Sequence, residues 1–350
     1  MRNQRLPLVL LPLAFGALAI APSAARANPL DPALSRLRIT AADDGGACPA
    51  TLTLDSGGTA TRRFCPDQPA WRRLMAELGT AAAPSILETA RTTGYSRFGL
   101  SLEGALTTIS QGDVWELGTE GPSSADRLFR NDAPAGVAFF SRFMVRKGFP
   151  FGFELGTGVS YMSDSELVLL GGHVKWSLFE GFRRGIGWLP DFAVRGGVNT
   201  MVGDWDFTLT TVSLDFILSK PFTLFQQGWV TPFVGVQLLW IFADSEVVDL
   251  TPEIDAYSDC LPNQMTGQCT RDPASPALQT PYVRQPQDDY TNSTTFESLR
   301  YGRQRLFFGA EGRYGVLRLT LAAGFDVAAP DPEQNAEGQF TFQMGAGLVF

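Results

Sequence analysis

The sequence predicts an all-β membrane protein: a transmembrane antiparallel up-and-down β-barrel of about ten strands (range about 8–12), with a small N-terminal segment before it. Three observations predict it. Ten segments from Ser96 onward alternate apolar and polar residues, their charged residues share one face, and the chain stops inside a strand-like stretch, "QFTFQMGAGLVF". Strands that cross a lipid bilayer must close into a barrel, because an open edge leaves backbone polar groups unpaired.

Residues 1–27 predict a secretory signal peptide. Arg2 and Arg5 precede an apolar run that extends from Leu6 to Ala21, and small residues then lead to Ala27, after which we expect cleavage. The run is short and broken by prolines, unlike a spanning helix. The signal peptide predicts export to an oxidising compartment, where four cysteines can form two disulfides, Cys48 with Cys65 and Cys260 with Cys269.

Composition excludes several classes of function. The chain is 44% hydrophobic, but after residue 27 no apolar run is long enough for a membrane helix. Its net charge of -8 argues against nucleic acid as a partner. One histidine, no CxxC and no HExxH leave no zinc pattern, and no glycine loop for phosphate is present. We therefore expect no cofactor and no metal.

Residues 28–93 predict a separate N-terminal segment. Cys48 and Cys65 lie symmetrically about the turn Ser56-Gly57, as the partners of a cross-strand disulfide in a hairpin would. In "DQPAWRRLMAELG", Pro69 indicates a helix start and Gly79 a helix stop. Two interpretations stay open: a plug or cap on the barrel, or a disulfide-pinned periplasmic extension.

Residues 94–350 predict the barrel itself. Strands are expected near 96–109, 136–147, 151–162, 167–179, 190–202, 207–219, 229–242, 303–313, 316–327 and 338–350. One face of these strands is apolar and uncharged, which suits lipid, since an Arg or Lys there costs about 2–4 kcal/mol. The other face is expected to line the lumen with Arg97, Glu103, Arg142, Arg146, Glu154, His173, Lys175, Arg195, Asp215, Arg305, Glu311, Arg313, Arg318 and Asp326.

The lengths of the connections predict the orientation of the barrel. With both termini periplasmic, the periplasmic turns are short or moderate, whereas the outward connections include 110–135, 243–302 and 328–337. Two outward loops, near 163–165 and 203–206, are short, so this rule holds in part. Aromatic residues cluster near strand ends, as in interfacial girdles. They include Tyr161, Trp188, Trp205, Trp229, Trp240 and Tyr314.

The last residues, "QMGAGLVF", resemble the assembly signal of outer-membrane barrels in Gln343, Gly345, Leu348 and Phe350. Several stretches also resemble an uncharacterised outer-membrane barrel family of the myxobacterial type. They are "ARTTGY", "KGFPFGFELG", "LFEGFRRGI", "LWIFADSEVVDLTP" and "RQRLFFGAEGRY". The resemblance implies a Gram-negative outer-membrane location, with partners in lipid, lipopolysaccharide and the barrel-assembly machinery. It implies no activity.

A barrel hydrolase is the enzymatic alternative. It would use His173 with Asp215 or Glu154 and take Ser177 or Ser213 as its nucleophile. Neither the Asp-x-His pair of omptin-type proteases nor the His-x-Ser pattern of lipid A deacylases is present around His173. A histidine within a hydrogen-bonded lumen network is the favoured interpretation, and we expect no catalytic residues.

The favoured function is a non-enzymatic outer-membrane barrel, either a narrow porin-like channel or a structural and surface-exposed protein. Its lumen list holds eight basic and five acidic residues, and opposite charges on a narrow interior wall favour a filled lumen over a selectivity filter. The third hypothesis is an extracellular binding module that uses loop 243–302. Its first part is acidic, but no EF-hand spacing appears. Oligomeric state is left open.

Overall fold

A computed structural model describes the barrel and much of the N-terminal segment. The described residues are 28–40, 48, 51–53, 59–61, 64–121, 131, 134–179, 189–225, 228–250, 260–262, 269–271, 293–327 and 338–350. The predicted signal peptide, most of loop 243–302 and all of connection 328–337 lie outside these residues, as does Trp188. Those interpretations stay predictions.

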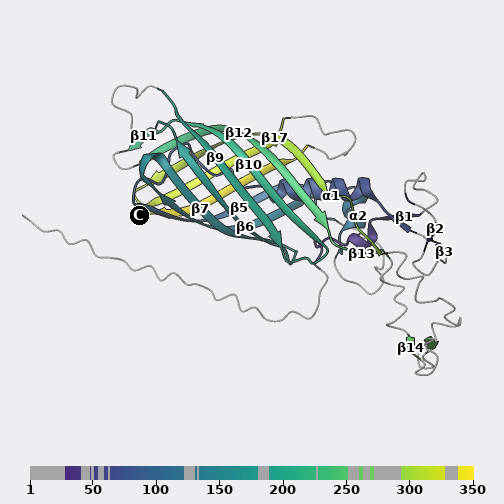
Figure 1. Cartoon of the computed structure of the whole chain (residues 1–350). Coiled ribbons are helices and arrows are strands. Elements are labelled where there is room, and N and C mark those ends of the chain that lie inside the picture. Colours follow the sequence, from purple (N-terminus) through teal and green to yellow (C-terminus); the bar gives the residue numbers. More distant parts are fainter. Residues whose placement is uncertain are drawn as a thin grey trace, which may run out of the picture.

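Ten strands form one closed antiparallel barrel (Figure 1). They are β5 (Phe98–Thr108), β6 (Val137–Gly148), β7 (Phe153–Met162), β8 (Val168–Ser177), β9 (Asp191–Val202), β10 (Phe207–Ser219), β12 (Gly228–Ser245), β17 (Leu299–Tyr314), β18 (Leu317–Asp326) and β19 (Phe340–Val349). Each pairs with its neighbour along the chain, and β5 pairs with β19. The short β11 (Phe222–Phe225) pairs with β12. The predicted fold class is confirmed, although β12 ends three residues later and β17 begins four residues earlier than expected.

The outer wall of the barrel is apolar and exposed. Every second residue of the strands faces outward, and many of these residues are large and apolar, such as Leu102 (68% exposed) and Leu319 (63% exposed). Water-soluble monomers rarely expose contiguous apolar surface of this extent. Of the expected aromatic girdle, Tyr161, Trp205, Trp240 and Tyr314 are exposed. The barrel therefore spans a membrane, with this wall toward lipid.

The two ends of the barrel differ. The C-terminal rim carries Phe350 and the turns 149–152, 178–190, 220–227 and 315–316. There the N–H of Phe98 donates to the carbonyl of Phe350 at 2.9 Å, which joins the first strand to the last residue. The opposite end, the loop rim, carries the connections 109–136, 163–167, 203–206, 246–298 and 327–339.

The N-terminal elements lie at the loop rim, at the opposite end of the barrel from the C-terminus (Figure 1). They are η1 (Leu34–Arg36), β1 (Arg38–Thr40), β2 (Thr51–Thr53), β3 (Thr59–Thr61), β4 (Phe64–Pro66) and α1 (Gln68–Ala81). Strand β2 pairs with β3 and β1 with β4. Cys48 and Cys65 form the predicted disulfide, with 6.2 Å between their Cα atoms.

One helix and two short strand pairs belong to the loops of this rim. Helix α2 (Asp113–Gly118) follows β5, and β13 (Val248–Asp249) pairs with β16 (Ser293–Thr294). Strand β14 (Cys260–Pro262) pairs with β15 (Cys269–Arg271). The side chains of those two cysteines lie outside the described part of the chain, so their disulfide stays a prediction.

Helix α1 closes the loop rim. Asp67 caps its start, since its Oδ1 accepts from the N–H of Ala70 at 3.0 Å, and Pro69 sits in the first turn. The prediction that Gly79 ends the helix was wrong, because the helix continues to Ala81. A Cβ on Gly79 would lie 2.4 Å from Cγ2 of Ile241, so the glycine lets α1 approach β12 closely. No described helix has the length and hydropathy to cross a membrane.

Candidate functional site: the lumen network

Residues 82–93, here called the luminal segment, cross the interior of the barrel. The segment follows α1 at the loop rim, and at the C-terminal rim the chain turns into β5. It has no strand partner of its own. Its contacts come from β5 to β10, β12, β18 and β19, that is, from strands all round the cylinder. A segment in contact with strands on every side lies within the lumen.

Side chains of the wall satisfy the backbone of the luminal segment. An extended chain with no strand partner needs such partners, because unpaired buried amides are costly. The carbonyl of Ala82 accepts from Asn199 Nδ2 at 2.8 Å, and that of Leu87 accepts from Arg318 Nη2 at 2.8 Å. The N–H of Ile86 donates to Gln343 Oε1 at 2.9 Å. Polar wall residues thus replace a strand as the partner of this backbone.

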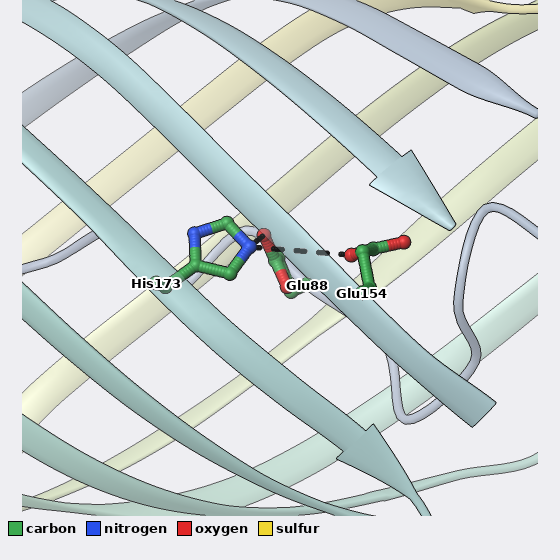
Figure 2. A group of neighbouring side chains, drawn as sticks. All are labelled: Glu88, Glu154 and His173. Atoms are coloured by element: carbon green, nitrogen blue, oxygen red, sulfur yellow. Dashed lines mark ion pairs between the residues drawn. The ribbon is translucent and has the colours of Figure 1, made fainter. Parts of the chain in front are cut away.

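Glu88 is the centre of an ion-pair cluster in the lumen (Figure 2). Its carboxylate lies 2.8 Å from Arg146 Nε and 3.0 Å from Lys175 Nζ. It also lies 3.0 Å from His173 Nε2, without hydrogen-bond geometry, and 3.7 Å from Arg195 Nη1. One acid from the luminal segment therefore meets basic groups from three wall strands, β6, β8 and β9.

Wall carboxylates complete the pairing of these basic groups. Arg146 also pairs with Glu103, Arg195 with Asp215, and Lys175 with Glu154, whose Oε1 lies 2.7 Å from Nζ. The three cations and Glu88 are at most 2% exposed. Buried charges of this kind tolerate no missing partner, since an unpaired charge costs several kcal/mol in such surroundings. The network therefore depends on Glu88 being in place.

A glycine makes room for His173. Gly156 on β7 pairs with His173 on β8, and a Cβ at Gly156 would lie 2.1 Å from the imidazole Cε1. The imidazole therefore lies across the position where another residue would have a side chain. From there its Nε2 faces both Glu88 and Glu154 (Figure 2), at 3.0 and 4.0 Å.

Glu88, Glu154 and His173 could each offer one ligand atom to a metal, and these atoms lie within 4.8 Å of one another. Lys175, however, already bridges the two carboxylates, at 3.0 Å from Glu88 and 2.7 Å from Glu154. A divalent cation there would lie beside fixed positive charge, with Arg146 adding a second cation. The donor set fits ion pairing better than metal binding.

Most of the predicted lumen residues are buried or half-buried in the structure. Those that are buried are Glu103, Arg142, Arg146, Glu154, His173, Lys175, Arg195, Asp215, Arg305 and Glu311. Arg313, Arg318 and Asp326 are half-buried. Arg97 is exposed and precedes β5 at the C-terminal rim, so it lies at the mouth of the barrel and not along the lumen.

The sequence interpretation missed Glu88, which organises the network. A signal for it existed: eight basic against five acidic residues in the predicted lumen called for more negative charge. The buried Asp191 at the start of β9, paired with Arg91 at 2.8 Å, was missed in the same way.

Of the residues proposed for a hydrolase, Asp215 and Glu154 form ion pairs with basic residues of the wall. Asp215 binds Arg195 at 2.7 Å, and the hydroxyl of Ser213 lies 3.4 Å from Asp215. The hydroxyl of Ser177 has no hydrogen-bond partner. Within the described residues, no serine hydroxyl contacts His173, so the imidazole has no nucleophile to activate.

Comparison with solved structures finds other barrels at low similarity. No protein-family model matches the chain, and no curated protein matches it. The N-terminal β-barrel domain of Pseudomonas aeruginosa OprF shares 10% identity, with 73% of this chain and 99% of that one covered and a TM-score of 0.27. Yersinia pestis Ail shares 9% identity over 73% and 100%, at a TM-score of 0.25. The translocator domain of the Neisseria meningitidis autotransporter NalP shares 10% over 80% and 94%, at 0.30.

Proposed function

We propose that this chain is a non-enzymatic barrel of the Gram-negative outer membrane that is closed by its own luminal segment. It serves as a structural, surface-exposed protein and not as an open channel. The exposed apolar wall and the closed strand order support a membrane barrel. The single observation that carries the closure is the luminal segment, held by side chains from strands all round the cylinder.

Burial inside the barrel supports a closed lumen. Glu88 is 0% exposed, and Arg195, which lies beside it, is 1% exposed. A water-filled passage beside the luminal segment would expose these groups to solvent. The mixed charges of the wall therefore act as a structural network and not as a selectivity filter.

Conductance tests the closure. The protein with its intact luminal segment, reconstituted into a planar bilayer, is expected to leave the bilayer insulating. A variant in which residues 82–93 are replaced by a Gly/Ser linker of equal length is expected to conduct, because that linker offers neither Glu88 nor the buried side chains of Ile86 and Leu87. Steady ion currents through the unaltered protein would refute a closed barrel.

The topology further supports display of residues 28–81 on the outer face. Barrels of this class have short periplasmic turns and longer outer loops, which makes the C-terminal rim the periplasmic one. The N-terminal elements lie at the other rim. The luminal segment then carries the chain from the outer face back to the periplasm. This proposed placement of residues 28–81 differs from the periplasmic or luminal placement expected from the sequence.

Labelling of single cysteines tests the orientation. Pro69→Cys and Tyr95→Cys place thiols at exposed positions on either side of the luminal segment. In intact cells a membrane-impermeant maleimide is expected to label Pro69→Cys. It is expected to label Tyr95→Cys only after the cells are permeabilised. The unaltered protein measures background from the native cysteines. The reverse labelling pattern would contradict outward display.

The resemblance to the myxobacterial-type barrel family supports the same proposal, with lipid, lipopolysaccharide and the barrel-assembly machinery as partners. Phe350 is 60% exposed and joins β5 through its backbone. Gln343 has a second role in the structure, because its Oε1 accepts from Ile86 and Ser85 of the luminal segment. Deletion of Phe350 is therefore expected to reduce assembly of the barrel. Gln343→Leu is expected to remove the hydrogen bonds between Gln343 and the luminal segment.

A binding role for loop 243–302 is the second candidate. Its C-terminal base packs on α1, where Phe296 stacks on Trp71 at 5.1 Å between ring centroids and Glu297 pairs with Arg72. The loop and the N-terminal elements thus share one surface. Deletion of residues 250–295 is expected to spare the barrel and to abolish attachment of a ligand or phage; retained attachment would exclude the loop.

A further inference from the structure

A cavity of about 220 Å³ lies at the C-terminal rim, between the end of the luminal segment and strands β7, β12, β17 and β18. It is separate from the Glu88 cluster, although Glu154 contributes to the edge of both. The polar side chains that matter for its chemistry are Arg91, Thr93, Arg97, Glu311, Arg313 and Arg318.

The arginines of this cavity are only partly neutralised. Arg91 pairs with Asp191 at 2.8 Å, and Arg318 Nε lies 2.8 Å from Glu311. Within the described part of the chain no carboxylate forms an ion pair with Arg97 or Arg313. The guanidinium of Arg313 instead lies 5.4 Å from the ring centroid of Trp229, and its Nε has no hydrogen-bond partner. These two guanidinium groups thus have no ion-pair partner among the described residues.

A buried hydroxyl in the cavity also lacks a partner. Thr93 is 5% exposed, and its Oγ1 makes no hydrogen bond. Native proteins pair nearly all buried polar side chains with protein groups, ordered water or a ligand. Glu311 acts attractively on the charge of Arg313, whereas Arg97, Arg318 and Arg91 act repulsively on it. The cavity thus combines an excess of arginines over carboxylates with an unused hydroxyl.

We propose that this cavity binds one phosphate group. Two free guanidinium groups match the charge of a phosphate dianion, and arginine binds phosphate oxygens through pairs of parallel N–H groups. The hydroxyl of Thr93 supplies a donor to a further oxygen. The phosphate has two sources at a membrane rim: the free ion in the periplasm or the headgroup of an anionic phospholipid.

Calorimetry of the full mature chain, refolded in a neutral detergent at low ionic strength, tests the site with inorganic phosphate as the probe. The double variant R97Q/R313Q removes both arginines that have no ion-pair partner and is expected to bind phosphate at least about tenfold more weakly, as loss of charge-assisted hydrogen bonds predicts. R300Q, an exposed arginine at the loop-rim end of the same strand β17, is the matched control and is expected to bind like the unaltered protein.

Native mass spectrometry separates the two sources. The unaltered protein is incubated with phosphatidylglycerol or with phosphatidylcholine, and the lipid adducts that survive are compared. Selective retention of phosphatidylglycerol, reduced in R97Q/R313Q, supports the headgroup; calorimetric binding of phosphate without such retention supports the free ion. The proposal is overturned when neither probe binds, or when the folded double variant binds as tightly as the unaltered protein.

Folding of the variants is checked by heat-modifiable gel mobility. Should the double variant fail to fold, R97Q alone serves, because Arg97 is exposed and precedes β5. This single variant is expected to bind phosphate more weakly than R300Q does. Equal affinity of R97Q and R300Q would overturn the site in that case.

Discussion

The outer and inner walls of the barrel are made by the same strands but are stabilised in different ways. Each outer residue, such as Leu102, meets lipid and depends little on the rest of the chain. Each inner charge, such as Arg146, needs a partner, and Glu88 comes from a segment outside the barrel sheet. The outer wall is therefore a property of each strand alone, whereas the inner wall is complete only with the luminal segment.

The largest effect is expected at the inner wall, from Glu88→Ala. The change leaves Lys175, Arg146 and His173 around an empty position, and removing one partner of a buried charge network costs about 3–5 kcal/mol. Urea titration followed by gel mobility measures the loss, and bilayer currents report release of the luminal segment. Glu297→Ala, an exposed glutamate paired with Arg72, is the control and should cost at most about 1 kcal/mol. Equal stability of the two variants would show that the network does not hold the segment.

On the outer wall, Leu102→Arg is expected to have the next largest effect. Leu102 lies near the middle of β5 and is 68% exposed, so the new charge would face the hydrocarbon core. The expected cost is about 2–4 kcal/mol, measured as the free energy of folding into lipid vesicles. Leu102→Phe keeps the apolar contact and should fold like the unaltered protein. An arginine tolerated without cost at this position would argue against contact with lipid.

Gly79→Val tests how closely α1 packs on β12 at the loop rim. The new side chain would meet Ile241, whose Cγ2 lies 2.4 Å from the added Cβ. Such overpacking costs about 1–3 kcal/mol, measured by urea titration. Adding Ile241→Ala to Gly79→Val should restore part of the loss. No recovery in the double variant would mean that another contact limits the helix.

The smallest effect concerns Asp204, in the turn between β9 and β10 at the loop rim. Burial, aided by the nearby carboxylates of Asp206 and Asp31, raises the pKa of Asp204 to about 6, although hydrogen bonds from backbone N–H groups oppose the rise. The folded state therefore holds this proton more tightly than the unfolded chain does, and stability should fall as the pH rises from about 4 to about 6. Asp204→Asn should remove this decrease of the urea midpoint with rising pH. An unchanged decrease would mean that other groups cause it.

The outer wall could be predicted from the sequence, because alternation of apolar residues is a local pattern. Leu102 and Leu319 follow that pattern, and both are exposed. Which charged residues pair with each other could not be predicted, since strand parity gives the direction of a side chain and not its partner. Glu88 lies in a stretch without alternation, so no pattern marked it as luminal. The prediction that the helix ends at Gly79 was wrong for a related reason. A glycine is needed there because of its contact with Ile241, which is far away in the sequence.

The seam between β5 and β19 bears on the order of events in assembly. The luminal segment leads directly into β5, and folded elements with a disulfide lie at its other end. The ten strands form a closed cylinder around the luminal segment, and the pairing of β5 with β19 completes it. If the luminal segment enters before β5 pairs with β19, that pairing encloses it on every side.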